Sequence, residues 1–560
     1  MPGKAKWLCL LLALLQVYMA NAQQFAFQVT FTDKNNTPYS LTSPGAYLSP
    51  RALTRRTMQG IAIDSTDLPV NQAYIDSVVT ITGGVFHESS RWLNMCMLLL
   101  HDSAQILNLA GKPYIGNIKL VGYYATNLHL RKSKTTGPIT APAAQRTTSG
   151  DCGYYNYTCT QTQLVNGYYL HDNGFDGQGM LIAVLDAGFI YSNSNPAFDS
   201  LMSSGRIIDT FDFVWHDNHV FQQDNHGSMV LSAMAGNLPG IFVGSAPKAM
   251  YALYLTEYDP DDQPLELDNM ICAAERADSI GADVITESLG YDLFSYPPGA
   301  GQVFATDFDG KTTVAAQAAN IATKKGMLFV ATAGNDGTPV PGWGTHILTP
   351  GDADSALTIG STDGSGTPST FSGYGPNAAG QIKPDVSAMG EGESLIVGAG
   401  YSSVPGTSFS TPQVAGWAAC LWEAHPNATT GQIRRAIIKC ASTYTSPGSQ
   451  LGYGVPNFEC TNQLLSVLDT PSPFTPSNWV IATPNPFYDK LMLDVKPNVA
   501  GDVAFRLTDM AGRDIYTVHY ILNKGHNVPV SISVPELPTG IYILKVVSAT
   551  QQKVLKLLRR

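Results

Sequence analysis

Three polar residues of different chemistry stand out in this 560-residue chain because each adjoins small or apolar residues. Asp186 ends the apolar run 181–185, His226 precedes an apolar helical pattern, and Ser408 lies in the small-residue segment 406–412. A serine hydroxyl becomes nucleophilic when a base takes its proton, and histidine titrates near enough to neutral pH to do so. A carboxylate orients the imidazole and stabilises its charged form. These residue types therefore predict nucleophilic catalysis at Ser408.

Each of the three residues also has an ordinary structural explanation. An Asp after a strand often caps a helix, a His beside Gly is more often structural than catalytic, and Ser-rich turns are common. The combination is more specific than its members, because the order Asp186, His226, Ser408 differs from the chymotrypsin and α/β-hydrolase orders.

Two further features would stabilise a negatively charged intermediate. Segment 329–337 is an apolar strand pattern that runs into Gly334 and Asn335, although the glycine-rich part alone would indicate only a turn. Ser408 is expected at the start of an apolar helix, with Pro412 in its first turn. The N-terminus of that helix would supply N–H groups and a partial positive charge near a developing oxyanion.

The elements that must position these residues lie between about 160 and 465, where short apolar runs alternate with helical patterns. This alternation predicts an α/β fold, a doubly wound parallel sheet covered on both faces. Ligand sites in such sheets lie at the carboxyl ends of the strands. Strands are expected at 180–185, 249–255, 283–286 and 327–331, and helices at 226–235, 269–280 and 313–324.

The chain begins with a targeting signal. Two lysines precede the apolar run 7–15, and the sequence Ala-Asn-Ala at 20–22 matches a signal-peptidase site. We therefore expect a signal peptide at 1–22, with cleavage before Gln23. A membrane anchor is the weaker alternative because the run is short. No later stretch is long and apolar enough to span a bilayer, so no membrane span is expected.

The regions on either side of the α/β pattern have different compositions. Strand-like runs occur at 25–31 and 114–121, and the stretch 133–150 has the Ser, Thr, Ala, Gly and Pro content of a linker. Six strand-like runs separated by turn signals in the tail predict a small antiparallel sandwich. The predicted parts are a signal peptide at 1–22, an N-terminal region with a linker at 23–150, the α/β domain at 151–470 and the C-terminal β-sandwich at 473–560.

Composition narrows the remaining possibilities. The net charge is −11 and 14% of residues are charged, which indicates a mildly acidic soluble protein and nothing that would bind nucleic acid. Export permits disulfides, and Cys152 with Cys159 and Cys440 with Cys460 are candidate pairs, although the connectivity stays open. No Cys/His spacing resembles a zinc site.

Residues 170–460 resemble the subtilase family of serine peptidases on the four segments around Asp186, His226, Asn335 and Ser408. The resemblance implies a subtilisin-like fold and a secreted endopeptidase that hydrolyses peptide bonds in proteins through an acyl-enzyme on Ser408. It also implies that His226 is the general base and acid and that Asn335 stabilises the oxyanion. The residues that follow His226 and Ser408 differ from the commoner ones, which is typical of a divergent branch.

The same resemblance identifies substrate-binding residues. In subtilases a Ser-Leu-Gly strand pairs with the substrate backbone, and it corresponds here to Ser288, Leu289 and Gly290, with Gly334 on the facing segment. No organic cofactor is implied. The calcium-loop residues of the family do not align, so the sequence gives no support for a structural calcium ion.

Subtilases often carry an amino-terminal pro-segment that assists folding and blocks the cleft. Residues 23–150 occupy that position, so the resemblance implies a zymogen with an intramolecular inhibitor. The alternative is a permanently retained β-rich module.

The tail resembles the type A carboxyl-terminal sorting domain of the type IX secretion system of Bacteroidetes, through Pro-Asn-Pro-Phe at 484–487 and the basic end at 556–560. That resemblance implies a partner in the secretion machinery and transport through the periplasm to the outer surface or the medium. The alternative is an ordinary sandwich that binds substrate or glycan. For the whole chain, the alternatives to an endopeptidase are a non-catalytic adhesion protein on a subtilase scaffold and a protease limited to self-processing.

Overall fold

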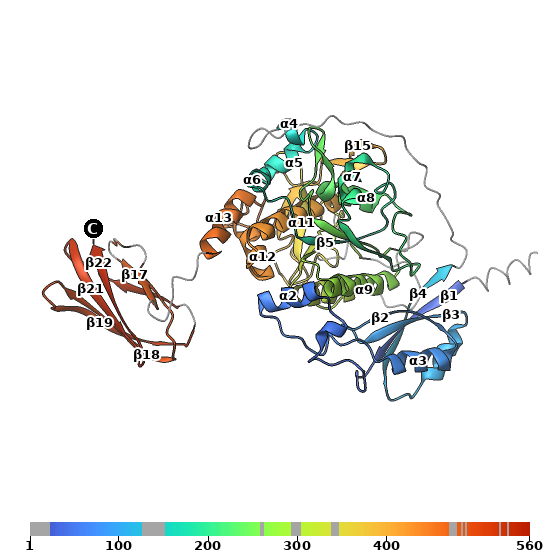
Figure 1. Cartoon of the computed structure of the whole chain (residues 1–560), viewed down its shortest axis with the longest axis horizontal. Helices are drawn as coiled ribbons and strands as arrows, with labels where there is room; N and C mark the ends of the chain where they lie inside the picture. The colour runs from blue at the N-terminus through green and yellow to red at the C-terminus, as the bar shows by residue number, and fades with distance from the viewer. Residues whose placement is uncertain are drawn as a thin grey trace, which may run out of the picture. The chain divides into compact units, whose positions relative to one another are not determined.

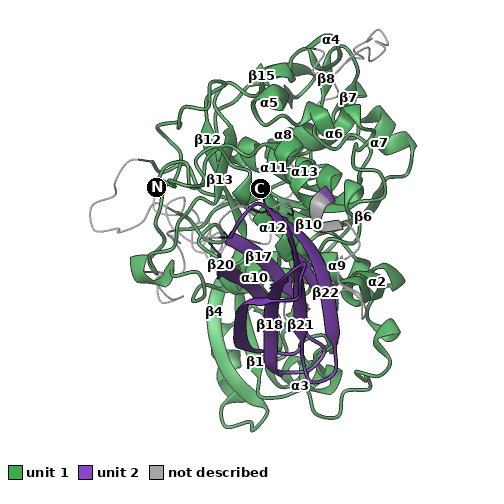
Figure 2. Ribbon diagram, turned by 90° about the vertical axis from the view of Figure 1, so that its left-hand side faces the viewer, with its two compact units in different colours: residues 1–465 green, residues 466–560 purple. Residues whose placement is uncertain are grey.

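The computed structural model shows two compact units, 1–465 and 466–560, and each is described by itself (Figures 1 and 2). The expected signal peptide at 1–22 and linker at 133–150 lie outside the residues that the structure describes. The described residues are 23–125, 152–257, 263–292, 304–337, 347–469, 479–482, 485, 487, 490–525, 528–534 and 537–559.

Seven strands form the central sheet of the first unit, in the order β13-β12-β11-β10-β5-β9-β6. Every neighbouring pair is parallel, which confirms the predicted α/β fold class. The strands are β5 (Leu181–Asp186), β6 (Ile207–Asp212), β9 (Met250–Leu255), β10 (Val284–Glu287), β11 (Leu328–Thr332), β12 (Leu357–Thr362) and β13 (Val386–Met389).

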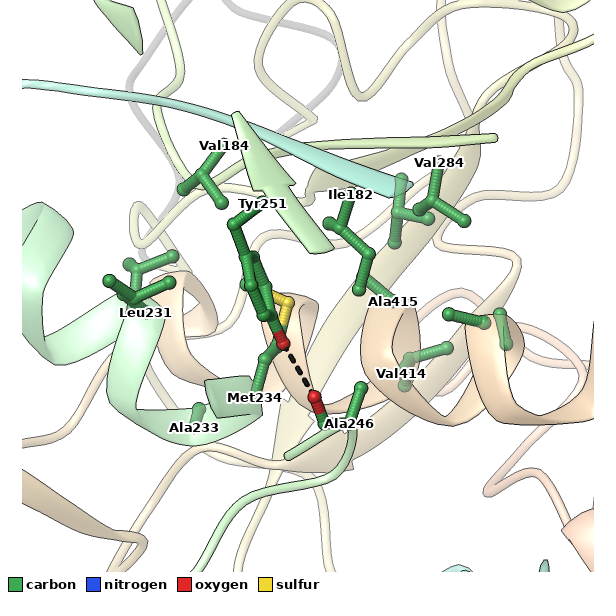
Figure 3. Close-up of a cluster of buried hydrophobic side chains, with 14 of the residues drawn as sticks. Ile182, Val184, Leu231, Ala233, Met234, Ala246, Tyr251, Val284, Val414 and Ala415 are labelled. Atoms are coloured by element: carbon green, nitrogen blue, oxygen red, sulfur yellow. Dashed lines mark hydrogen bonds between the residues drawn. The ribbon is translucent and has the colours of Figure 1, made fainter. Parts of the chain in front are cut away.

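Helices cover both faces of this sheet, and successive side chains of each strand point into opposite cores. Ile182 and Val184 of β5 lie in one core with α8 and α11, where the Tyr251 hydroxyl donates to the Ala246 carbonyl at 2.8 Å (Figure 3). Leu181 lies in the other core with α9 and α10. Because both faces are buried, the strands have continuous apolar sequences. The helices are α8 (His226–Ala235), α9 (Leu265–Ile280), α10 (Val314–Lys324) and α11 (Thr407–Ala424).

The order of the strands reverses beside β5. The chain runs from β5 to β6 and β9 on one side, and then from β10 to β13 on the other. In open α/β sheets a crevice forms outside the carboxyl ends of the strands at such a reversal. The carboxyl ends of β5 and β10 are therefore the expected location of a site.

The ends of the helices follow from capping residues. The Thr313 side chain accepts from the Ala316 N–H at the start of α10, and α9 ends at Gly281 with a φ of 91°, which favours glycine. The expectation for Pro412 is wrong by one turn, because α11 begins at Thr407 and Pro412 is its sixth residue. Pro412 has no N–H, so it cannot make the helical hydrogen bond to the Ser408 carbonyl.

The N-terminal region forms a four-stranded antiparallel sheet with two helices. The predicted strands are present, and they are accompanied by two helices that were not predicted, α2 (Pro50–Gln59) and α3 (Gln72–Thr82). Their signals were in the sequence as the N-caps Ser49 and Asn71. In Figure 1, α2 of this region lies beside α9. The sheet order is β2-β3-β1-β4, with β1 (Gln23–Phe31), β2 (Val85–Ser90), β3 (Met95–Leu100) and β4 (Ile115–Ala125).

The second unit consists of two antiparallel sheets around a shared apolar core, as a sandwich requires. All six predicted strands are present, and β16 is a short additional strand. One sheet has the order β16-β17-β20 and the other β19-β18-β21-β22, with β16 (Val480–Ala482), β17 (Lys490–Val495), β18 (Gly501–Asp509), β19 (Asp514–Leu522), β20 (Val528–Ser533), β21 (Gly540–Val547) and β22 (Gln552–Arg559).

Short elements and two disulfides complete the first unit. Cys152–Cys159 and Cys440–Cys460 are bonded, which confirms both candidate pairs. Smaller elements are α4 (Cys152–Tyr155), α5 (Cys159–Leu164), α6 (Tyr168–Asp172), α7 (Asp199–Ser203), α12 (Thr430–Lys439), α13 (Phe458–Asp469), β7 (Asn237–Leu238), β8 (Phe242–Val243), β14 (Ser394–Val397) and β15 (Gly400–Ser403).

Candidate active site

Asp186 and His226 meet at the carboxyl end of β5. Asp186 is the last residue of the strand and is fully buried, whereas His226 begins α8. Nδ1 of His226 lies 2.8 Å from Oδ1 of Asp186, and the Ala187 N–H donates to the same oxygen at 2.8 Å. An ionised carboxylate can only accept, so Nδ1 carries the hydrogen and Nε2 of the neutral imidazole is left as an acceptor. This is the tautomer that a general base needs.

The charges around His226 favour its protonated form. Burial by itself lowers the pKa of His226, but the charge of Asp186 and the hydrogen bond to it, with smaller contributions from Asp224 and Glu257, outweigh burial and raise that pKa above its usual value. The Asp224 carboxylate also accepts a hydrogen bond from the backbone N–H of His226 at 2.7 Å. The imidazole side chain is 25% exposed, so a substrate can reach it.

A glycine after the histidine allows α8 to approach β5. A Cβ atom at Gly227 would lie 2.4 Å from the Gly188 carbonyl oxygen and 2.9 Å from Cβ of Asp186. Any larger residue would push the helix away and lengthen the contact between His226 and Asp186.

Ser408 lies at the start of α11, beside the end of β10. It is the second residue of the helix, so its N–H has no acceptor within the helix and lies at the positive end of the helix dipole. Its hydroxyl donates to the Ser288 carbonyl at 3.1 Å. The ring of the next residue, Phe409, is centred 5.6 Å from the His226 ring. The start of α11 therefore lies beside His226, although 182 positions separate that histidine from Ser408.

Asn335 is attached to the same helix start. Its Oδ1 accepts from the N–H of Thr407 at 2.9 Å and lies 2.9 Å from the Thr407 hydroxyl oxygen. A backbone N–H can only donate, so the amide oxygen must face Thr407 and the amide NH₂ group points away from it. The exposed Asn335 side chain thus keeps the N–H groups of its amide available near the start of α11. The Thr407 hydroxyl also contacts the Thr332 hydroxyl at 2.6 Å, which ties β11 to α11.

The predicted substrate-binding residues occupy the ends of two neighbouring strands. Ser288, Leu289 and Gly290 follow β10, and Gly334 follows β11 with a φ of 94°. Because β10 pairs with both β5 and β11, the structure brings all eight predicted site residues to one edge of the sheet. Their functional roles remain proposals.

Two acidic residues near the site, Glu287 and Glu257, were missed by sequence reasoning. Glu287, the last residue of β10, is fully buried, and burial together with the charges of Glu257 and Asp186 raises its pKa well above the usual value. The Tyr291 hydroxyl donates to Oε1 of Glu257 at 2.5 Å. An acidic residue at the end of an apolar strand was the only available signal for Glu287, and nothing in the sequence indicated Glu257.

No group of three or more His, Cys, Asp or Glu side chains within the described ranges is arranged to hold a metal ion. The expectation that no cofactor is needed remains a prediction.

The N-terminal region is joined to α9 by a buried ionic cluster. The Asp278 carboxylate accepts from Arg55, Arg56 and Arg91, whose side chains are at most 8% exposed. One turn earlier on the helix, the Glu275 carboxylate accepts a hydrogen bond from the backbone N–H of Arg91 at 2.9 Å. Arg55 and Arg56 therefore bind Asp278 on this helix, whereas Arg51 binds Asp283 just before β10.

Comparison with known proteins identifies the three parts. Residues 177–455 match the Subtilase family. Subtilisin BL from Lederbergia lenta is 30% identical over 287 residues, which cover 51% of this chain and 90% of that protein. The chain belongs to the subtilase family. Residues 26–137 of this subtilase match the Peptidase S8 propeptide domain, Bacteroidota, and residues 483–559 match the secretion system C-terminal sorting domain.

Other relatives are matched over part of their length. The thermophilic serine proteinase of Bacillus sp. (strain AK1) is 30% identical over 289 residues, 51% of this subtilase and 62% of that protein, which is less than two thirds of its length. The crystal structure of the epidermin leader peptide processing serine protease from Staphylococcus aureus shares the fold, with a TM-score of 0.54, 18% identity and coverage of 79% of this chain and 99% of that one.

The matched domains also indicate the form in which the subtilase is synthesised and its destination. Its propeptide domain is that of a zymogen, and its sorting domain directs it to the outer surface or the extracellular space. Among the described helices, none has the length and apolar character to cross a membrane.

Proposed function

We propose that this subtilase is a secreted serine endopeptidase that hydrolyses peptide bonds in proteins through an acyl-enzyme on Ser408. The observation that carries the proposal is the 2.8 Å contact between His226 Nδ1 and Asp186 Oδ1, because it leaves Nε2 of His226 as an acceptor that can take a proton from a nucleophile. A scaffold that only bound a partner would have no use for this tautomer.

The proposed reaction has two stages, acylation of Ser408 and hydrolysis of the acyl-enzyme, and the same site residues act in both. The Ser408 hydroxyl, which donates to the Ser288 carbonyl at rest, rotates toward His226 and transfers its proton to Nε2 as Oγ attacks the carbonyl carbon. The Asn335 amide and the Ser408 N–H donate to the oxyanion. His226 then protonates the leaving amine, and water hydrolyses the acyl-enzyme by the reverse sequence.

The propeptide domain is proposed to act as the intramolecular inhibitor of this site. The buried ionic cluster around Asp278 supports a docked propeptide, because it joins three arginines of the propeptide domain to α9 of the catalytic domain. Mass spectrometry of the active protein tests its removal: a mature terminus at Gln23 would overturn the proposal, and a terminus after the propeptide would support it.

A protease limited to its own propeptide, or to one leader peptide, is the second candidate. The fold shared with the epidermin leader peptide processing protease favours it. Purified mature protein and Ser408→Ala should be treated with a fluorophosphonate probe and then with casein. Labelling and casein cleavage by the wild type alone support the endopeptidase, labelling without casein cleavage supports the narrow protease, and absence of labelling refutes both.

The secretion machinery is the proposed partner of the tail. Deletion of 473–560 should leave the protein in the periplasm with its catalytic domain folded. Export of the deleted protein to the medium at the wild-type level would show that the tail serves another purpose.

A further inference from the structure

The side chain of Leu348 fills the gap between the segments that follow β10 and β11. A Cβ atom built on Gly290 would lie 2.9 Å from Cδ1 and 3.0 Å from Cβ of Leu348. A Cβ atom built on Gly334 would lie 2.6 Å from Cγ and 2.8 Å from Cδ1 of the same leucine. The same carbons of Leu348 therefore lie close to both glycines.

The backbone around Leu348 is anchored to both segments. The Leu348 N–H donates to the Ala333 carbonyl at 3.3 Å, next to Gly334. Thr349 and Tyr291 exchange two backbone hydrogen bonds, at 2.9 and 3.3 Å, next to Gly290. The Thr349 hydroxyl lies 2.5 Å from that of Thr313. Leu348 is half-buried, and hydrogen bonds on both sides fix its main chain at the gap that its side chain occupies.

The gap lies where the acyl part of a substrate must go. With the substrate carbonyl carbon at Ser408 Oγ, its oxygen points toward Asn335 and its amine toward His226. The remaining substituent of the carbonyl carbon is the α-carbon of the residue before the scissile bond. That α-carbon then lies over Ser288, whose carbonyl oxygen is 3.1 Å from the Ser408 hydroxyl oxygen. The side chain of that substrate residue therefore points between Gly290 and Gly334.

We propose that Leu348 is a specificity-determining residue, and that it restricts the residue before the scissile bond to Gly, Ala or Ser. This inference rests on the proposed function. The leucine occupies the space that a larger substrate side chain would need, and an aromatic ring would have to displace it. A single methylene in an apolar pocket changes kcat/KM by roughly 10- to 200-fold, so the discrimination against Phe should be at least 10-fold.

The test compares tetrapeptide p-nitroanilides that carry Ala, Leu or Phe before the scissile bond, using mature wild type, Leu348→Ala and Leu348→Val. The wild type should prefer Ala to Phe by at least 10-fold in kcat/KM. Leu348→Ala should raise kcat/KM for Phe at least 10-fold and change that for Ala less than threefold, with Leu348→Val between them. Leu464→Ala, a half-buried leucine on α13, is the matched control and should keep the wild-type ratio.

Peptidyl diphenyl phosphonates with an Ala or a Phe side chain report the same gap without peptide turnover, because they need only a reactive Ser408. Preference of the wild type for Phe in either assay overturns the inference while leaving the proposed function intact. An unchanged ratio of kcat/KM between the Ala and Phe substrates in both folded Leu348 variants also overturns the inference and leaves the proposed function intact. Absence of labelling by both phosphonates overturns the proposed function and the inference together.

Discussion

Replacing Asp278 with asparagine should release the propeptide domain from α9. Asp278 is fully buried, and its carboxylate faces Arg55, Arg56 and Arg91, all with side chains at most 8% exposed. Asparagine keeps the volume but removes the negative charge, so the three guanidinium groups are left facing a single amide oxygen.

The size of the effect follows from the burial. Removing one partner of a buried ion pair costs about 3–5 kcal/mol. Arg56 keeps Asp67 and Arg91 keeps Glu275, so the lower value of about 3 kcal/mol applies. Since about 1.4 kcal/mol is a factor of ten, the undocked state should become roughly 10²-fold more populated.

Amide hydrogen exchange measures undocking directly. The N–H groups of Arg91 and Trp92 donate across the interface to Glu275 at 2.9 and 3.0 Å, so they exchange when the propeptide leaves. In full-length protein with Ser408→Ala, which prevents self-cleavage, Asp278→Asn should speed their exchange roughly 10²-fold.

A matched control removes a carboxylate that does not face the propeptide. Asp209 binds Arg276 at 2.6 and 2.8 Å within the catalytic domain, so Asp209→Asn should leave the exchange of Arg91 and Trp92 unchanged. A rate increase below about threefold (under about 0.7 kcal/mol) in Asp278→Asn would refute the reasoning and show that the apolar contacts alone hold the propeptide.

Three further predictions concern the catalytic domain. Asn335→Ala should lower kcat about 10²- to 10³-fold with an unchanged circular dichroism spectrum, a loss known for this donor in the subtilisin family; a loss below fivefold would exclude it as an oxyanion donor. The pKa of His226 is raised and the base must be neutral, so kcat/KM should fall as pH drops through that pKa. Asp186→Asn should move this acidic limb of the pH profile to lower pH and lower kcat about 10⁴-fold. An acidic limb that stays in place would rule out Asp186 as the cause of the raised pKa. Replacing Cys440 and Cys460, which are 20 positions apart, by serine should lower the free energy of unfolding by about 3 kcal/mol in urea titrations, and equal midpoints would show that the bridge constrains nothing.

Local patterns predicted the parts of the fold that depend on local burial. Leu181 and its neighbours form an unbroken apolar run because β5 is buried on both faces, so the strand was recognisable in the sequence. The alternating strands of the tail were recognisable because one face of each sheet is exposed. The helices α2 and α3 were not predicted, although the caps Ser49 and Asn71 mark where they begin.

The candidate site divides in the same way. Asp186, His226, Asn335 and Ser408 were found because each stands at a strand end or helix start with small residues that allow close approach. Their residue types and order were therefore enough, by themselves, to indicate acyl-transfer chemistry at Ser408.

The sequence alone thus determined the class of chemistry, the parallel sheet and the flanking domains, because these depend on residue type and period. Only the tertiary structure decided that Leu348 lies between Gly290 and Gly334, and that Asp278 faces three arginines of the propeptide domain. Those contacts join segments 14 to more than 200 positions apart, from Gly334 to Leu348 and from Arg55 to Asp278. The order of strands across the sheet and the docking of α2 on α9 create them, and no local pattern records that order.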